Sequence, residues 1–114
     1  MICDDYAKID NSDGALMPVS IERIFENERY KQISLAHYYE LNGDLMTDPE
    51  MIFTQIKSCR IFIPSYFKQD NLGIEQESIV MENGEIKGYK AKMQADQTLF
   101  ANMWLRNIKE QQNL

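Results

Sequence analysis

The amino-acid sequence predicts an α+β fold, in which an antiparallel β-meander of about six strands is covered by one C-terminal amphipathic helix. Three observations support this prediction. Short apolar segments that alternate with period two recur between clusters of turn residues. Asn83-Gly84, the strongest short signal for a β-hairpin, separates two such segments, residues 77–82 and 85–91. The apolar spacing then changes to that of a helix over residues 96–111.

The N-terminal part of the chain contains two predicted strands. Residues 6–10 alternate with period two, and residues 11–14 (Asn-Ser-Asp-Gly) have the composition of a tight turn. Residues 18–25 are predicted to form the next strand. A helix remains the alternative there, because the apolar residues from Ile21 to Phe25 also fit helical spacing.

The longest predicted strand covers residues 33–41. Period-two alternation divides its side chains into two faces: Ile33, Leu35, His37, Tyr39 and Leu41 on one, and Ser34, Ala36, Tyr38 and Glu40 on the other. The strand is expected to end at Asn42-Gly43-Asp44, which is a turn or a bulge. Asp48-Pro49 is expected to mark the next reversal of the chain.

Two further strands are predicted at residues 50–57 and 60–67, followed by a polar loop at residues 68–73. Pro64 cannot donate a backbone hydrogen bond to a neighbouring strand. The segment that contains it is therefore expected to be an edge strand or to carry a bulge.

The predicted helix has an apolar side that is expected to contact the sheet, formed by Leu99, Phe100, Met103, Trp104 and Ile108. Its polar side is expected to consist of Gln97, Asn102, Arg106, Lys109 and Glu110. Asp96 is the predicted N-cap, because its carboxylate can accept a hydrogen bond from the first turn.

Length and charge limit the class of protein. A chain of 114 residues is long enough for one domain with a hydrophobic core and no disulfide or metal. Its net charge of −6 and pI of about 4.7 oppose non-specific attraction to nucleic acid.

The cysteine pattern and hydropathy predict a cytoplasmic protein. Cys3 and Cys59 form no paired motif, so both are expected to be free thiols in a reducing compartment. No apolar run reaches the length of a membrane-spanning helix, and no secretory leader is recognised.

The sequence offers little material for catalysis. His37 is the single histidine, and on a strand it points away from Glu40, so the two cannot share one metal ion without a bulge. No phosphate-binding glycine loop is present. We therefore predict no catalytic residue, no metal and no cofactor, and a half-buried His37 that hydrogen-bonds a turn or a tyrosine hydroxyl. The alternative is an enzyme or metal-dependent module centred on His37 with Asp44 and Asp70.

The carboxylates are concentrated in two stretches without Lys or Arg, between Lys31 and Lys57 and between Lys68 and Lys87. If the turns of these stretches meet at one end of the sheet, they form an acidic rim that attracts a basic partner. The predicted partner-binding residues are Glu40, Asp44, Asp48, Glu50, Asp70, Glu75 and Glu77. Ordinary solvated turns are the alternative interpretation.

Three segments carry a family resemblance: residues 37–51 (HYYELNGDLMTDPEM), 65–73 (SYFKQDNLG) and 100–109 (FANMWLRNIK). In this order they resemble a bacterial family of unknown function that is associated with phages and mobile elements. The resemblance spans nearly the whole chain and implies a compact domain, without implying a reaction. Its polar motif residues are His37, Tyr39, Asn42, Gln69 and Asn71. Polar residues of the motifs are interpreted as fixing turns, namely His37, Asn42, Asp44, Gln69, Asp70 and Asn71.

The leading functional hypothesis is a small non-enzymatic interaction protein of a phage or mobile element. It is expected to inhibit a host defence component, such as a CRISPR effector, by binding a basic, nucleic-acid-processing protein through the acidic rim. A further alternative is an accessory domain that binds nucleic acid through Lys87, Lys90 and Lys92.

Overall fold

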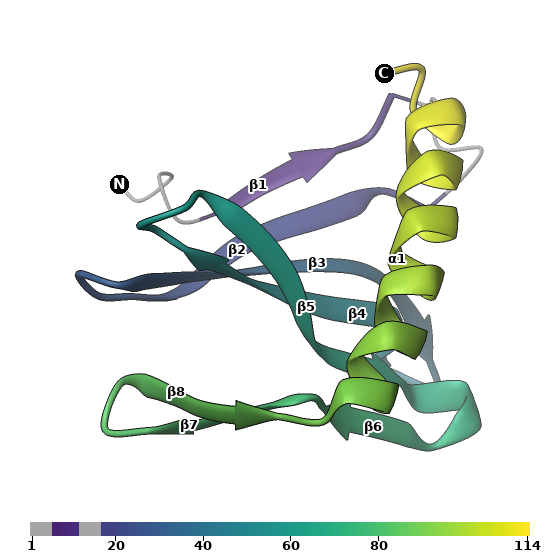
Figure 1. Ribbon diagram of the computed structural model, residues 1–114. Helices are drawn as coiled ribbons and strands as arrows, with labels where there is room; N and C mark the ends of the chain where they lie inside the picture. Colours follow the sequence, from purple (N-terminus) through teal and green to yellow (C-terminus); the bar gives the residue numbers. More distant parts are fainter. Residues whose placement is uncertain (1–5, 12–16) are drawn as a thin grey trace.

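The computed structural model describes residues 6–11 and 17–114. Its main element is a six-stranded antiparallel sheet in the order β1-β2-β3-β4-β5-β6, so each strand pairs with the next one along the chain (Figure 1). The strands are β1 (Tyr6–Ile9), β2 (Val19–Glu26), β3 (Tyr30–Leu41), β4 (Asp44–Ile56), β5 (Ile61–Gln69) and β6 (Ile74–Glu77). A two-stranded sheet, β7 (Ile79–Glu82) with β8 (Glu85–Tyr89), and the helix α1 (Ala91–Gln111) follow. The predicted α+β meander with one C-terminal helix is confirmed.

The segment that could have been a helix is a strand. β2 pairs with both β1 and β3, and a bulge at Ile24 interrupts its pairing with β3. The helical alternative fails because this segment lies between two strands that use its backbone donors and acceptors. Of the turn predicted at residues 11–14, residues 12–14 lie outside the described residues.

β3 and β4 form a long hairpin whose loop is Asn42-Gly43. Both residues have positive φ, 53° and 85°, as a two-residue loop of this kind requires. The reversal predicted at Asp48-Pro49 is wrong, because β4 runs through these residues from Asp44 to Ile56. Asp48 and Pro49, joined by a cis peptide bond, instead stand opposite the single residue His37 as a bulge.

Pro64 lies beside a third bulge, so of the two predicted alternatives, an edge strand or a bulge, the bulge is the one found. Ile52 pairs with Tyr66 and Phe53 with Pro64, so Ser65 is the extra residue on β5. The carbonyl oxygen of Pro64 accepts hydrogen bonds from Ser78 Oγ (3.1 Å) and Gln94 Nε2 (3.2 Å). The bulge therefore connects the sheet to the start of α1.

The strand predicted at residues 77–82 is divided in two. β6 continues the main sheet as far as Glu77, and Ser78 breaks the strand before β7 begins. Asn83 and Gly84 have φ of 55° and 76°, which confirms the hairpin predicted from this dipeptide. The loop predicted at residues 68–73 is shorter than expected, because β5 extends to Gln69 and a 3₁₀ turn, η2 (Asp70–Leu72), follows.

The β7–β8 hairpin packs against the side of the sheet that faces away from α1. Gln32 Nε2 lies 3.6 Å from Met81 Sδ, and Asn27 Nδ2 donates to the carbonyl oxygen of Gly84 at 3.1 Å. The Arg29 guanidinium also pairs with Glu85 at 2.5 Å. These contacts join the hairpin to the beginning of β3.

Helix α1 begins earlier than predicted. Lys90 is the N-cap residue and makes no side-chain capping hydrogen bond, so Asp96 lies inside the helix and the predicted N-cap is wrong. The run Ala91 to Gln94 contains good helix formers, which extend the helix without a polar cap. No helix in the part of the chain that the structure describes is long and apolar enough to cross a membrane.

The side of α1 that contacts the sheet is rotated from the prediction. Gln97, Ala101, Trp104 and Ile108 are buried, whereas Leu99 and Met103 are 71% and 50% exposed. Trp104, Ile108 and the partly buried Phe100 were therefore predicted correctly, and Leu99 and Met103 were not. The small Ala101 lets the helix approach the sheet closely, and Gln97 is accommodated because its Nε2 donates to the carbonyl oxygen of Gln76 at 3.1 Å.

The hydrophobic core lies between α1 and the sheet. Val19 from β2, Met51 from β4 and Phe67 from β5 form one cluster with Ala101, Trp104 and Ile108. Phe67 and Phe100 pack edge to face with their ring centroids 4.9 Å apart. The last residues of the chain are fixed to its beginning by Gln112, which is fully buried.

Gln112 makes three hydrogen bonds to the connection between β1 and β2. Its Oε1 accepts from the Asn11 backbone N–H at 2.6 Å, its carbonyl oxygen accepts from Asn11 Nδ2 at 3.0 Å, and its Nε2 donates to the Met17 carbonyl oxygen at 3.2 Å. The end of α1 is thereby tied to the first two strands.

We expect Trp104→Ala to lower the free energy of unfolding by about 3–5 kcal/mol, because it leaves a large cavity in the core. Met103→Ala, on the exposed side of the same helix, should cost less than about 1 kcal/mol. Urea denaturation of both variants measures these losses. Similar losses for the two variants would contradict the position of α1 described above.

Candidate functional site

The sheet has one face under α1 and one face that α1 does not cover, called here the open face. Strand register places these residues, among others, on it: Glu22, Ser34, Tyr38, Glu50, Tyr66, Lys68, Glu75 and Glu77. The β7–β8 hairpin covers one end of this face, where Ile79 and Met81 lie near Gln32 and Ile52. The remaining part carries mostly carboxylates and tyrosines.

Glu50 occupies the centre of the open face. Its Oε2 accepts a hydrogen bond of 2.6 Å from Ser34 Oγ, and Ser34 is itself only 3% exposed. Lys68 is the cross-strand neighbour of Glu50 on one side and of Glu75 on the other. The Lys68 ammonium also lies 3.7 Å from Asp70 Oδ1. One cation therefore lies among three carboxylates and pairs with one of them, Asp70.

The two tyrosines of this face have raised pKa values, chiefly because they are partly buried and secondly because carboxylates lie near them. Burial raises the pKa of Tyr66, and the hydrogen bond that its hydroxyl donates to Glu75 raises it further, as do the charges of Glu75, Glu50 and Asp70. Burial also raises the pKa of Tyr38, with the charges of Glu50 and Glu22 adding to the effect. Both phenols therefore remain protonated donors at neutral pH.

A second group of polar contacts lies where the β4 bulge meets η2. Asp70 Oδ2 accepts from the Thr47 backbone N–H at 2.8 Å, and Gln69 Nε2 donates to Asp48 Oδ1 at 2.8 Å. These bonds hold the end of β5 against the bulge. Gln69, a predicted motif residue, thus fixes local structure, and Asp48 and Asp70 are brought next to the open face.

The structure brings together only part of the predicted acidic rim. Asp48, Glu50, Asp70, Glu75 and Glu77 are joined by strand pairing and by the contacts at η2. Glu40 and Asp44 are separated from them, at the exposed tip of the β3–β4 hairpin. The hairpin tip lies apart from the other carboxylates because Asp48-Pro49 does not reverse the chain, so β4 continues as far as Asp44.

The remaining motif residues lie outside this cluster. Asn42 forms the hairpin loop, and Asn71 is exposed in η2. Tyr39 pairs with Met46 near the hairpin tip and is half-buried.

His37 belongs to the side of the sheet that α1 covers. It is 5% exposed, its ring packs edge-on against Trp104 with centroids 5.5 Å apart, and its Nδ1 donates to the Pro18 carbonyl oxygen at 3.0 Å. The histidine is thus more deeply buried than predicted, and its partner is a backbone carbonyl.

The alternative centre of His37 with Asp44 and Asp70 is not assembled. Asp44 lies at the tip of the β3–β4 hairpin, and the Asp70 carboxylate accepts a hydrogen bond from the Thr47 backbone N–H. Within residues 6–11 and 17–114, no group of His, Cys, Asp and Glu side chains is arranged to hold a metal ion. Cys59 is an exposed free thiol in the turn before β5, and Cys3 lies outside the described residues.

The lysines of the nucleic-acid alternative are partly neutralised. Lys87 pairs with Glu85 at 3.0 Å and Lys92 with Asp96 at 3.6 Å, while Lys90 precedes α1 as its N-cap residue. Two of the three lysines therefore have a carboxylate beside them.

Sequence reasoning missed Glu22, Tyr38, Tyr66 and Lys68 as members of the site. Alternation alone had already placed Tyr38 on the face opposite His37, which was a usable signal. Glu22, Tyr66 and Lys68 join it only through the register of β2, β4 and β5, because a bulge in each strand shifts the pairing.

A comparison with known protein families shows which family the chain belongs to. Residues 3–114 match the model of a family described as Domain of unknown function (DUF6908). The chain belongs to this family. No curated protein and no solved structure matches it. The expected family of unknown function over nearly the whole chain is thus confirmed, and the DUF6908 fold is the meander with one covering helix described above.

We expect Tyr66→Phe to reduce the loss of stability at alkaline pH. The pKa of Tyr66 is raised above its ordinary 10.0 in the folded protein, so the unfolded chain loses this proton first. Its contribution to stability is therefore complete below pH 10 and falls as pH rises above that value. Urea denaturation at a series of alkaline pH values measures the effect, with Tyr89→Phe, at an exposed tyrosine outside the open face, as control. Parallel pH curves for wild type and Tyr66→Phe would contradict it.

Proposed function

We propose that this protein is a non-enzymatic interaction protein that binds a basic protein surface through the open face of its sheet. The observation that carries the proposal is the position of Glu50 on this face, where it accepts a hydrogen bond from the buried Ser34 and lies on the strand between those that carry Tyr38 and Tyr66. Further carboxylates surround this group: Glu22, Asp70, Glu75 and Glu77.

The chemistry of this face fits a protein partner better than a nucleic acid. Its carboxylates repel phosphate, and together they attract a basic surface and speed its association at low salt. Tyr38 and Tyr66 add rigid, amphipathic contact area with a hydroxyl donor, which is typical of the residues that dominate binding energy. The strands beneath them provide a fixed support for both.

The proposed partner is a nucleic-acid-processing protein of a bacterial defence system, such as a CRISPR effector. Such proteins carry basic grooves because they bind phosphate backbones. An acidic domain seated in that groove excludes the nucleic acid and inhibits the protein without any chemical step. The family resemblance to proteins of phages and mobile elements supports this role, which would be carried out in the cytoplasm of the host.

We expect charge reversal on the open face to weaken binding. Glu22→Lys and Glu77→Lys each alter an exposed carboxylate and should raise Kd by about 3- to 10-fold, chiefly through slower association. Glu40→Lys changes the charge by the same amount at the hairpin tip and should have little effect. High salt should weaken binding of the wild type and reduce the difference between the variants.

The experiment has two steps. Tagged wild type and the double variant Glu22→Lys/Glu77→Lys are used to capture proteins from lysates of bacteria with defence systems, and captured proteins are identified by mass spectrometry. Association kinetics with each purified candidate are then measured at low and high salt for all variants. The role of the open face would be refuted by a Kd that changes neither with salt nor with the open-face reversals. It would also be refuted if Glu40→Lys raised Kd as much as those reversals do. Capture restricted to proteins without a nucleic-acid-binding groove would refute the proposed target.

A further inference from the structure

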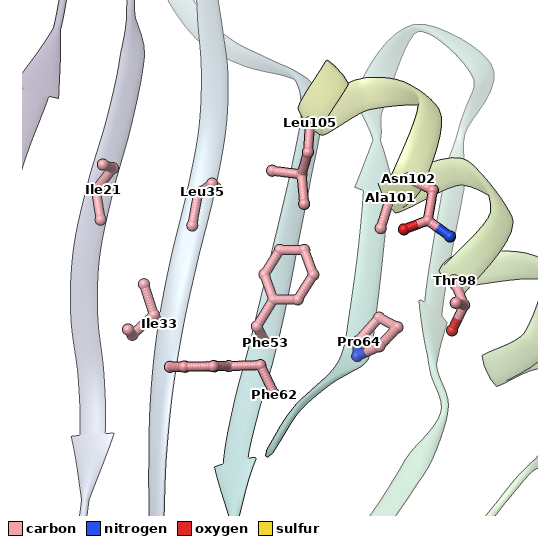
Figure 2. A pocket seen from close by; sticks show the side chains of 10 residues that line it. All are labelled: Ile21, Ile33, Leu35, Phe53, Phe62, Pro64, Thr98, Ala101, Asn102 and Leu105. Atoms are coloured by element: carbon pink, nitrogen blue, oxygen red, sulfur yellow. The ribbon is translucent and has the colours of Figure 1, made fainter. Parts of the chain in front are cut away.

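The other face of the sheet contains an apolar groove that α1 leaves partly uncovered. It has a volume of about 470 Å³ and lies between the middle of α1 and strands β2 to β5. Figure 2 shows side chains of the sheet, among them Phe53 and Phe62, opposite Ala101 and Leu105 of the helix. Phe62 is 47% exposed and Leu105 39% exposed, so the groove is open to solvent.

The wall of this groove contains no charged residue. Its two polar side chains, Thr98 and Asn102, both come from α1, and the Thr98 hydroxyl donates its proton to the Gln94 carbonyl oxygen at 2.9 Å. An apolar cavity of this size with a few polar groups on one side is typical of sites for small apolar ligands. The part of a ligand that lies inside must therefore be uncharged.

Helical spacing places a cation beyond the end of the groove near Leu105. Lys109 follows Leu105 by one helical turn and thus lies on the same side of α1. Helical side chains lean toward the N-terminus, which directs Lys109 toward Leu105. Among the described residues no carboxylate pairs with Lys109, whereas Arg23, on the neighbouring part of β2, pairs with Glu26 at 3.1 Å.

We propose that the groove binds a single-chain anionic amphiphile, with its aliphatic chain against Phe53 and Phe62 and its carboxylate near Lys109. The uncharged wall accommodates the chain, and the cation at one end supplies the complementary charge. This site is independent of the proposed protein interface, because it lies on the opposite face of the sheet.

The probes for this proposal are decanoate and its uncharged analogue 1-decanol, titrated by calorimetry. Wild type should bind decanoate more tightly than 1-decanol. Lys109→Gln should weaken decanoate binding by about 2- to 5-fold and leave 1-decanol unchanged, as expected for one exposed charge pair. Lys92→Gln removes a cation from the exposed first turn of the same helix and should change neither affinity.

Phe62→Glu tests the groove itself. It places a carboxylate in the wall at a half-exposed position and should abolish binding of both probes, while the urea midpoint confirms that the fold is retained. Equal effects of Lys109→Gln and Lys92→Gln, or equal affinity of wild type for the two probes, would overturn the assignment of the carboxylate. Absence of decanoate binding together with a dimer that Phe62→Glu dissociates would overturn the proposal and make the groove an interface between two copies.

Discussion

The packing of Trp104 against the sheet is the interaction on which the rest of the structure depends. This one side chain belongs to a cluster with Val19, Met51 and Phe67, which come from three different strands. Its ring also meets the edge of His37, beside the bulge in β4. In the described part of the chain, α1 is the large element that excludes water from the apolar face of the sheet, so the helix and the sheet stabilise each other.

The two faces of the sheet have opposite chemistry because side chains alternate along every strand. Leu35 and Met51 face the helix, whereas their neighbours Ser34 and Glu50 meet on the open face. The bulges change this pattern locally and increase the twist of the sheet. A straight helix can follow a twisted sheet only over part of its width, which leaves the apolar groove beside α1 uncovered.

The open face carries several carboxylates close together, with Lys68 as the cation among them. Ser34 donates to Glu50 and Tyr66 donates to Glu75, and the charges of nearby carboxylates add to the burial that raises the pKa of both tyrosines. Such a group opposes the folded state through self-repulsion. A basic partner would relieve this repulsion, which is the physical link between the geometry of the face and the function proposed for it.

The sequence by itself determined the elements that depend on local chemistry. Asn83-Gly84 specified a hairpin, alternation specified the strands, and helical spacing identified Trp104 and Ile108 as contacts of the helix, because each signal involves residues close in the chain. Tertiary structure decided the rest. Leu99 has the same local pattern as Phe100, but α1 packs through the side that contains Gln97 and Ala101, and Leu99 points away from that side. The grouping of Glu22, Glu50 and Glu75 depends on strand register, which the bulges shift and which no local pattern encodes.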